Sequence, residues 1–91
     1  MVLDDVFLFL HNNGYARTHS IFSTEFLGHS PRYYDYLRCS GAEPSLRSLV
    51  RLVLHLSDVA NGSASTPSDK ARARALAKRV MSAVVDHCRH T

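Results

Sequence analysis

The chain has few of the residues that build disulfide scaffolds, metal sites and cofactor loops. Its 91 residues include two cysteines, four glycines and no tryptophan. Cys39 and Cys88 lie far apart without metal-like spacing, which favours reduced thiols over a disulfide framework or a zinc finger. Every glycine falls at an expected helix end or loop, and no nucleophile elbow or H-E-x-x-H helix is present. The sequence therefore predicts a protein that needs no cofactor and is not an enzyme.

Long apolar runs are missing as well. No run approaches the roughly 20 residues that cross a bilayer. The opening segment VLDDVFLFL carries two aspartates where a signal peptide carries lysine or arginine. A membrane-surface role is disfavoured because the basic C-terminal segment lacks Trp and Phe anchors. We expect a cytoplasmic protein with no membrane partner.

The charge is distributed unevenly along the chain. The formal net charge is +3, yet residues 1–28 hold one cation against three carboxylates and residues 61–91 hold six cations against two aspartates. A basic C-terminal segment of this kind favours an anionic partner or surface.

Apolar spacing predicts an all-α fold, a compact bundle of about five helices. Leu3, Val6, Phe7 and Leu10 recur at helical spacing in the first helix. Residues 1–60 are expected to form a bundle that contains a helix-turn-helix. Residues 61–91 are expected to add a loop and a long basic C-terminal helix packed on the same single domain.

The helix-turn-helix is expected between residues 18 and 41. Thr18 would cap a first helix over 19–27, and Gly28 would end it in the left-handed conformation that other residues resist. Ser30 would cap a second helix over 31–39, whose first position is a proline with no amide to satisfy. The two helices would thus be joined by a very short turn.

Two longer helices are predicted to follow. The fourth would start at Glu43, Pro44 and Ser45, with a buried stripe that comprises Leu46, Leu49, Val50, Val53, Leu54 and Leu56. The last would start at Thr66 and Pro67 and run to about His90. Its small-residue stripe is predicted to be a dimerisation surface and consists of Ala73, Leu76, Ala77, Val80 and Val84. A core helix with a solvated basic face and an anion-binding arm are the alternatives.

Histidines do not gather into a convincing metal site. The chain has six, and the only local cluster is His87, Cys88 and His90 at the end of the sequence. A chain terminus offers no fixed geometry and no fourth ligand is apparent, so no metal is expected.

The second helix of the pair carries the functional clue. Tyr34, Leu37 and Tyr33 fall on an inward face, whereas Arg32, Tyr36 and Arg38 project elsewhere. Arginine reaches phosphates or guanine edges, and tyrosine hydroxyls reach phosphates. The alternative is an ordinary surface helix with two of its tyrosines in the core.

The order of these elements resembles lambda-repressor-like and Cro-like DNA-binding domains over residues 1 to about 58. Gly28, Ser30 and Pro44 match the turn glycine, the small polar start of the third helix and the proline before the fourth. The chain also resembles a group of small bacterial and phage proteins with an FS…LG.SPRYY core. The resemblance implies a bundle of about five helices and a transcriptional regulator of bacterial, phage or mobile-element origin.

The resemblance also implies how double-stranded DNA would be bound. The second helix of the pair would enter the major groove, and the predicted contacts are His29, Ser30, Arg32, Tyr33 and Tyr36, with Arg17, Arg38, Arg47 and Arg51 on phosphates. Two such domains would pair as a homodimer on one duplex.

A second hypothesis belongs to a different class. Small helical proteins of phage origin also act as inhibitors that bind a host defence complex such as a CRISPR effector. The same tyrosine-rich surface would serve, because Tyr and Arg dominate protein interfaces.

Overall fold

The computed structural model describes residues 2–62 and 66–89, and confirms the all-α fold. The helices are α1 (Val2–Asn12), α2 (His19–Ile21) with its π-helical continuation η1 (Phe22–Phe26), α3 (Tyr33–Ser40), α4 (Leu46–Asn61) and α5 (Pro67–Arg89). The described residues include no strand. When α2 and η1 are counted as one helix, the bundle has the expected five helices.

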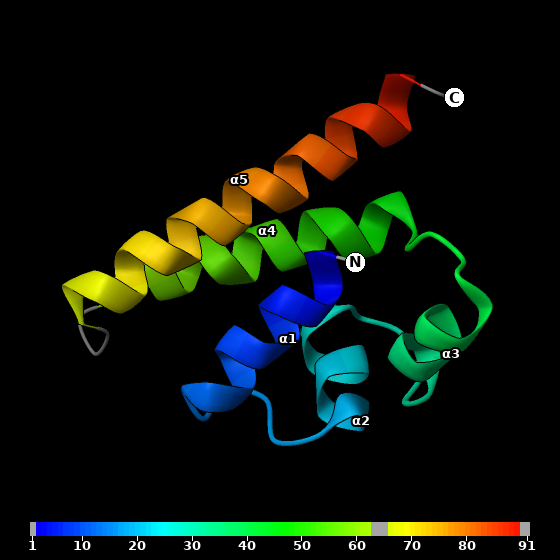
Figure 1. Cartoon of the computed structure of the whole chain (residues 1–91), viewed down its shortest axis with the longest axis horizontal. Coiled ribbons are helices and arrows are strands. Elements are labelled where there is room, and N and C mark those ends of the chain that lie inside the picture. Colours follow the sequence, from blue (N-terminus) through cyan, green and yellow to red (C-terminus); the bar gives the residue numbers. More distant parts are fainter. Residues whose placement is uncertain (1, 63–65, 90–91) are drawn as a thin grey trace.

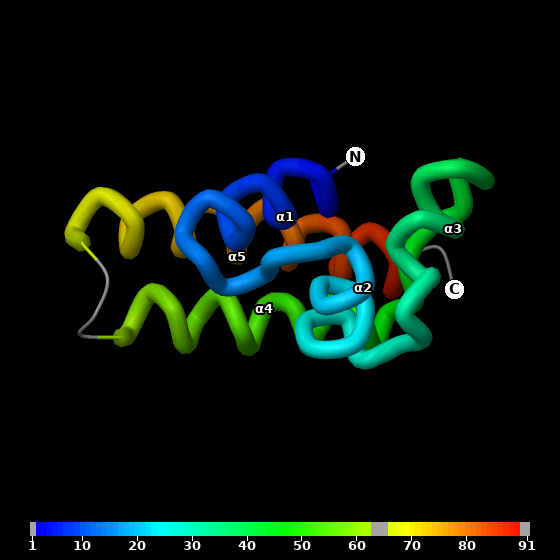
Figure 2. Tube along the Cα trace, turned by 90° about the horizontal axis from the view of Figure 1, so that it is seen from below, coloured from blue at the N-terminus to red at the C-terminus, as the bar shows by residue number. Residues whose placement is uncertain are grey.

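The two long helices form the frame of the bundle. α4 and α5 run antiparallel side by side, and α1, α2–η1 and α3 lie on one side of this pair (Figures 1 and 2). Each helix contributes aliphatic or aromatic side chains to one shared core. Its main members are Leu3, Val6 and Leu10, Phe22 and Phe26, Tyr34 and Leu37, Leu49, Leu52 and Leu56, and Ala73, Leu76 and Val80.

α1 forms as its apolar spacing predicts. Asp4 and Asp5 lie in its first turn, where carboxylates complement the helix dipole. Asp5 also reaches across to α5, where its carboxylate lies 2.7 Å from the guanidinium of Arg79. The acidic first helix is thereby tied to the basic last one.

The first helix of the predicted pair begins as expected and then widens. The Thr18 hydroxyl accepts a hydrogen bond from the amide of Ile21 (3.1 Å), which confirms the predicted cap. The amide of Leu27 donates to the carbonyl of Phe22, five residues back, so the second half is a π-helix rather than the regular helix expected over 19–27. The Ser23 hydroxyl donates to the carbonyl of His19 (2.9 Å), the kind of backbone contact that bends a helix.

The start of α3 differs from the sequence prediction. Ser30 and Pro31 form a turn closed by a hydrogen bond from the amide of Tyr33 to the carbonyl of Ser30 (3.1 Å), and the helix begins only at Tyr33. The predicted serine cap is therefore wrong. The buried hydroxyl of Ser23, on the preceding helix, accepts from the amide of Tyr34 instead (3.0 Å). Because Ser23 supplies the acceptor for this amide, α3 does not need a capping side chain at Ser30.

α4 is capped by Ser45, whose hydroxyl accepts from the amide of Ser48 (3.2 Å), but its buried stripe is rotated from the predicted one. Leu52, left out of that prediction, is fully buried, whereas Val50 and Leu54 are 42% and 61% exposed. The physical reason is that α4 packs between η1 and α5, so the side chains that face these neighbours are buried.

The predicted dimerisation stripe on α5 is used within the monomer. Ala73, Leu76 and Val80 are buried, and Ala77 and Val84 are half-buried against the same core. The 16-residue α4 runs antiparallel beside the stripe and covers it, as in the alternative of a core helix with a solvated basic face.

Candidate nucleic-acid interface

The outward side of α3 carries a row of residues without a carboxylate. Tyr33, Tyr34 and Leu37 are buried, so Arg32, Tyr36 and Ser40 follow one another four residues apart towards solvent. Tyr36 is 59% exposed, and the Ser40 hydroxyl donates to the backbone carbonyl of Tyr36 (2.7 Å). The row thus presents the guanidinium of Arg32 and the phenol of Tyr36, and its third side chain, Ser40, is small.

The only acidic residue of α3 is held at the edge of this row. The Asp35 carboxylate lies 2.6 Å from Nδ1 of His19 on α2. This contact directs its charge towards the neighbouring helix. The Asp35 side chain remains 54% exposed at this edge.

Tyr33 lies on the inward face that helical spacing predicts, and not at the surface where the resemblance placed it as a DNA contact. It is 8% exposed, and its hydroxyl accepts a hydrogen bond from the amide of Ser45 at the start of α4 (2.8 Å). The exposed ring of His29 stacks on it with centroids 3.7 Å apart. Tyr33 therefore fixes the turn to α4, and His29 is the aromatic group left at the surface.

The side chain of Arg51 lies directly against the backbone of Gly28. Gly28 has φ +65°, and a Cβ there would lie 2.7 Å from Cδ of Arg51. The Arg51 guanidinium donates through Nε and Nη2 to the carbonyl of Glu25, both at 3.4 Å. The turn glycine thus leaves room for an arginine to lie over the end of η1.

α4 supports the same turn through a buried serine. The Ser48 hydroxyl donates to the carbonyl of Leu27 (2.9 Å). Arg47 precedes Arg51 by one helical turn and is exposed. Of the predicted contacts, His29, Ser30, Arg32 and Arg51 therefore lie on or beside the turn between η1 and α3, and Arg47 lies one helical turn before Arg51 on α4.

The other two predicted arginines lie away from this turn. Nε of Arg38 is 3.5 Å from the Asp4 carboxylate, and its guanidinium lies over the Tyr34 ring, so α1 partly compensates its charge. Arg17 is exposed in the segment between α1 and α2. The structure thus separates a cationic turn from an Arg38 that is engaged with α1.

A polar contact that the sequence did not reveal fixes α3 on α1. The Tyr34 hydroxyl donates to the Asp4 carboxylate, and the Phe7 ring lies beside the Tyr34 ring with centroids 5.6 Å apart. Burial, together with the bond to Asp4, raises the pKa of Tyr34 well above the ordinary tyrosine value. The partners are 30 residues apart in sequence, so no local spacing could signal them.

Two other kinds of site find no support in the described part of the chain. Within residues 2–62 and 66–89, no three His, Cys, Asp or Glu side chains lie where they could hold a metal ion, and His90 of the predicted cluster lies outside these residues. Among the same residues, no helix has the length and apolar character needed to cross a membrane.

Comparison with known proteins gives a family and nothing further. No curated protein and no solved structure matches this chain. One family model, described as a family of unknown function (DUF6626), matches residues 3–91. Since the match covers nearly the whole chain, the protein belongs to the DUF6626 family.

Proposed function

We propose that this chain binds double-stranded DNA by placing the outward side of α3 in the major groove, as a small transcriptional regulator. The observation that carries the proposal is the row of Arg32, Tyr36 and Ser40, free of carboxylates, next to a turn flanked by Arg51, with Arg47 one helical turn before it on α4. Arginine and tyrosine are groups that contact bases and phosphates. An α-helix with its side chains is about 10 to 12 Å in diameter, which fits the roughly 12 Å width of the major groove.

The residues would divide the work. Arg32, at the start of α3, is placed to reach base edges, where a guanidinium recognises guanine with two hydrogen bonds. Arg47 and Arg51 would contact phosphates on the α4 side of the turn, and Arg17 would do so near α2. Arg38 would contribute less than the sequence predicts, because it already faces the Asp4 carboxylate.

The test compares DNA binding by the intact protein and by single variants. Selection from a random-duplex library supplies the best sequence, and fluorescence anisotropy then measures affinity at two salt concentrations. Arg32→Ala should reduce discrimination between the selected and a scrambled duplex by about tenfold. Arg47→Ala should weaken both duplexes alike and lower the salt dependence. Arg74→Ala, an exposed arginine on α5, is the matched control and should leave discrimination unchanged.

One outcome would overturn the proposal. If no duplex binds at low salt at about 100 μM protein, where even non-specific DNA binders associate, the chain is not a DNA-binding protein. The exposed Tyr36 and Arg32 would then be examined as the contact surface of a protein inhibitor, since these residue types dominate protein interfaces.

A further inference from the structure

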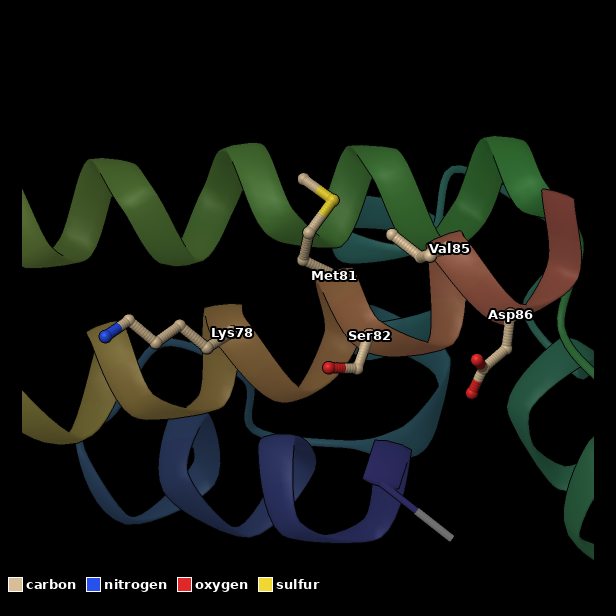
Figure 3. A pocket seen from close by; sticks show the side chains of 5 residues that line it. All are labelled: Lys78, Met81, Ser82, Val85 and Asp86. Carbon is tan, nitrogen blue, oxygen red and sulfur yellow. The ribbon is translucent and has the colours of Figure 1, made fainter. Parts of the chain in front are cut away.

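α5 exposes an apolar surface that is distinct from its buried stripe. Met81 and Val85, four residues apart, are 44% and 41% exposed. Lys78, Ser82 and Asp86 complete a shallow hollow around them, in which Met81 and Val85 lie on the side towards α4 (Figure 3). The monomer covers these two side chains only in part, so their remaining apolar atoms lie in water.

The charges around this hollow are spaced symmetrically. Lys78 precedes Ser82 by four residues, and Asp86 follows it by four. Along an α-helix the two charged residues are about 12 Å apart, so they do not neutralise each other within one chain. Arg79, next to Lys78, is different because it already pairs with Asp5 at 2.7 Å.

We infer that this surface binds a second copy of the chain, with the two α5 helices antiparallel about a two-fold axis near Ser82. A two-fold contact is self-complementary, so residues equally far from the axis meet across it. Lys78 of each copy then faces Asp86 of the other. Met81 and Val85 of both copies are covered, and the small Ser82 lies at the closest approach.

The charge pattern selects this arrangement over a parallel one. A parallel pair in register would place Lys78 opposite Lys78 and Asp86 opposite Asp86, and like charges in contact oppose association. In the antiparallel pair, Arg89 falls opposite Ala75, so it meets no second cation. Any other partner would need an anionic group opposite Lys78 and a cationic group opposite Asp86 at the same spacing. A second α5 in antiparallel orientation carries both.

The size of the surface sets the expected affinity. In this arrangement α5 overlaps its copy over residues 75–89, about 22 Å of helix, and a strip about 10 Å wide gives roughly 220 Å² on each copy. A total of about 440 Å² is far below the standard size of stable interfaces, so the dimer should be weak, with a dissociation constant of about 100 μM. Partly exposed ion pairs add little to affinity and mainly select the orientation.

Sedimentation velocity of the full chain without DNA tests this inference, over about 5 to 500 μM, a range that brackets a dissociation constant of about 100 μM. The unmodified protein should shift from monomer to dimer as its concentration rises. Met81→Glu should raise the dissociation constant at least about tenfold, because it places a carboxylate in the apolar contact. Leu8→Glu changes an exposed leucine on α1 in the same way and should leave the dimer unchanged.

Charge reversal tests the antiparallel geometry itself. Lys78→Asp should weaken the dimer by placing a carboxylate opposite Asp86 of the other copy. The double variant Lys78→Asp with Asp86→Lys should restore it, because the pairs are re-formed with opposite sign. Circular dichroism confirms that each variant is folded.

Three results would overturn the inference: a monomer throughout the concentration series, a dimer that tolerates Met81→Glu, or a double variant as weak as Lys78→Asp alone. Each is measured without DNA. The outcome is therefore independent of whether the chain binds a duplex, and the two proposals can fail separately.

Discussion

The two helical hairpins of this bundle are held together by different means. The α4–α5 hairpin is long and packs through aliphatic side chains such as Leu52, Leu56 and Leu76. The α2–η1–α3 hairpin is short and packs Phe22 against Tyr34, and it adds directional polar contacts, among them the bond from the amide of Tyr34 to Ser23 and the pair of His19 with Asp35. Non-directional burial stabilises the first, and directional bonds fix the geometry of the second.

This difference matches the roles we propose for the two parts. A surface that reads DNA needs its side chains held in one orientation. The turn before α3 is held in this way by Ser48 from α4 and by the packing of Arg51 over Gly28. The long hairpin supplies stability and leaves one face of α5 for contact with another copy.

The largest expected effect is in the long hairpin. Leu52→Ala should lower the free energy of unfolding by about 2 to 5 kcal/mol, since the side chain is fully buried and its removal leaves a cavity. Leu54→Ala, two residues on, should change it by less than about 0.5 kcal/mol because that side chain is 61% exposed. Urea denaturation of both variants measures the difference. Equal losses would show that α4 is rotated from its described orientation.

This pair also shows what apolar spacing can and cannot predict. The spacing of leucine and valine over residues 46–56 is enough to predict a helix, and Ser45 marks its start. Leu52 and Leu54 both fit a broad apolar arc, however, and the positions of η1 and α5 decide which one is buried. Helix existence is therefore a local property here, whereas the exact buried face depends on neighbours that the spacing does not specify.

The candidate site was predictable to a smaller extent. Gly28, Arg32 and Arg51 could be selected because a turn glycine and arginines near a short helix are visible in the sequence. The hydrogen bond from the Ser45 amide to the Tyr33 hydroxyl and the capping of α3 by Ser23 could not. Both depend on partners 11 or more residues away, Ser45 and Tyr34, and helical periodicity carries no information at that separation.

The second expected effect is in the short hairpin. Ser23→Ala should cost about 1 to 3 kcal/mol, because the amide of Tyr34 loses its acceptor in the interior. Ser20→Ala, an exposed serine on α2, is the control and should have little effect. Urea denaturation gives the stabilities, and hydrogen exchange should be faster at the Tyr34 amide. An unchanged exchange rate there would show that Ser23 does not cap α3.

A smaller effect is expected at the turn itself. Gly28→Ala should cost about 1 to 2 kcal/mol for the left-handed backbone, and more if Arg51 cannot move away. Gly14 has a similar φ of +79° and nothing within 4 Å of an added Cβ, so Gly14→Ala measures the backbone cost alone. Combining Gly28→Ala with Arg51→Ala should bring the loss near that of Gly14→Ala. A loss that persists in the double variant would show that Arg51 is not the obstacle.

The smallest effect at neutral pH is expected for Tyr34→Phe, which removes the hydroxyl bonded to Asp4 and should cost about 1 kcal/mol. Its influence grows in alkali. The folded state raises the pKa of Tyr34 above the ordinary value of about 10, so the tyrosine's contribution is fully present below that pH and is lost as the pH rises through and beyond it. Above pH 10 the unfolded chain releases this proton first, and unfolding becomes easier by up to about 1.4 kcal/mol per pH unit. The variant lacks this group, so the stability difference between the two proteins should shrink and then reverse in sign.

Urea denaturation of both proteins between pH 7 and about 11 measures this difference. The titration of the other tyrosines is the same in both proteins and cancels from it. A constant difference across that range would show that the Tyr34 hydroxyl reaches water and that α3 is not fixed to α1 through Asp4.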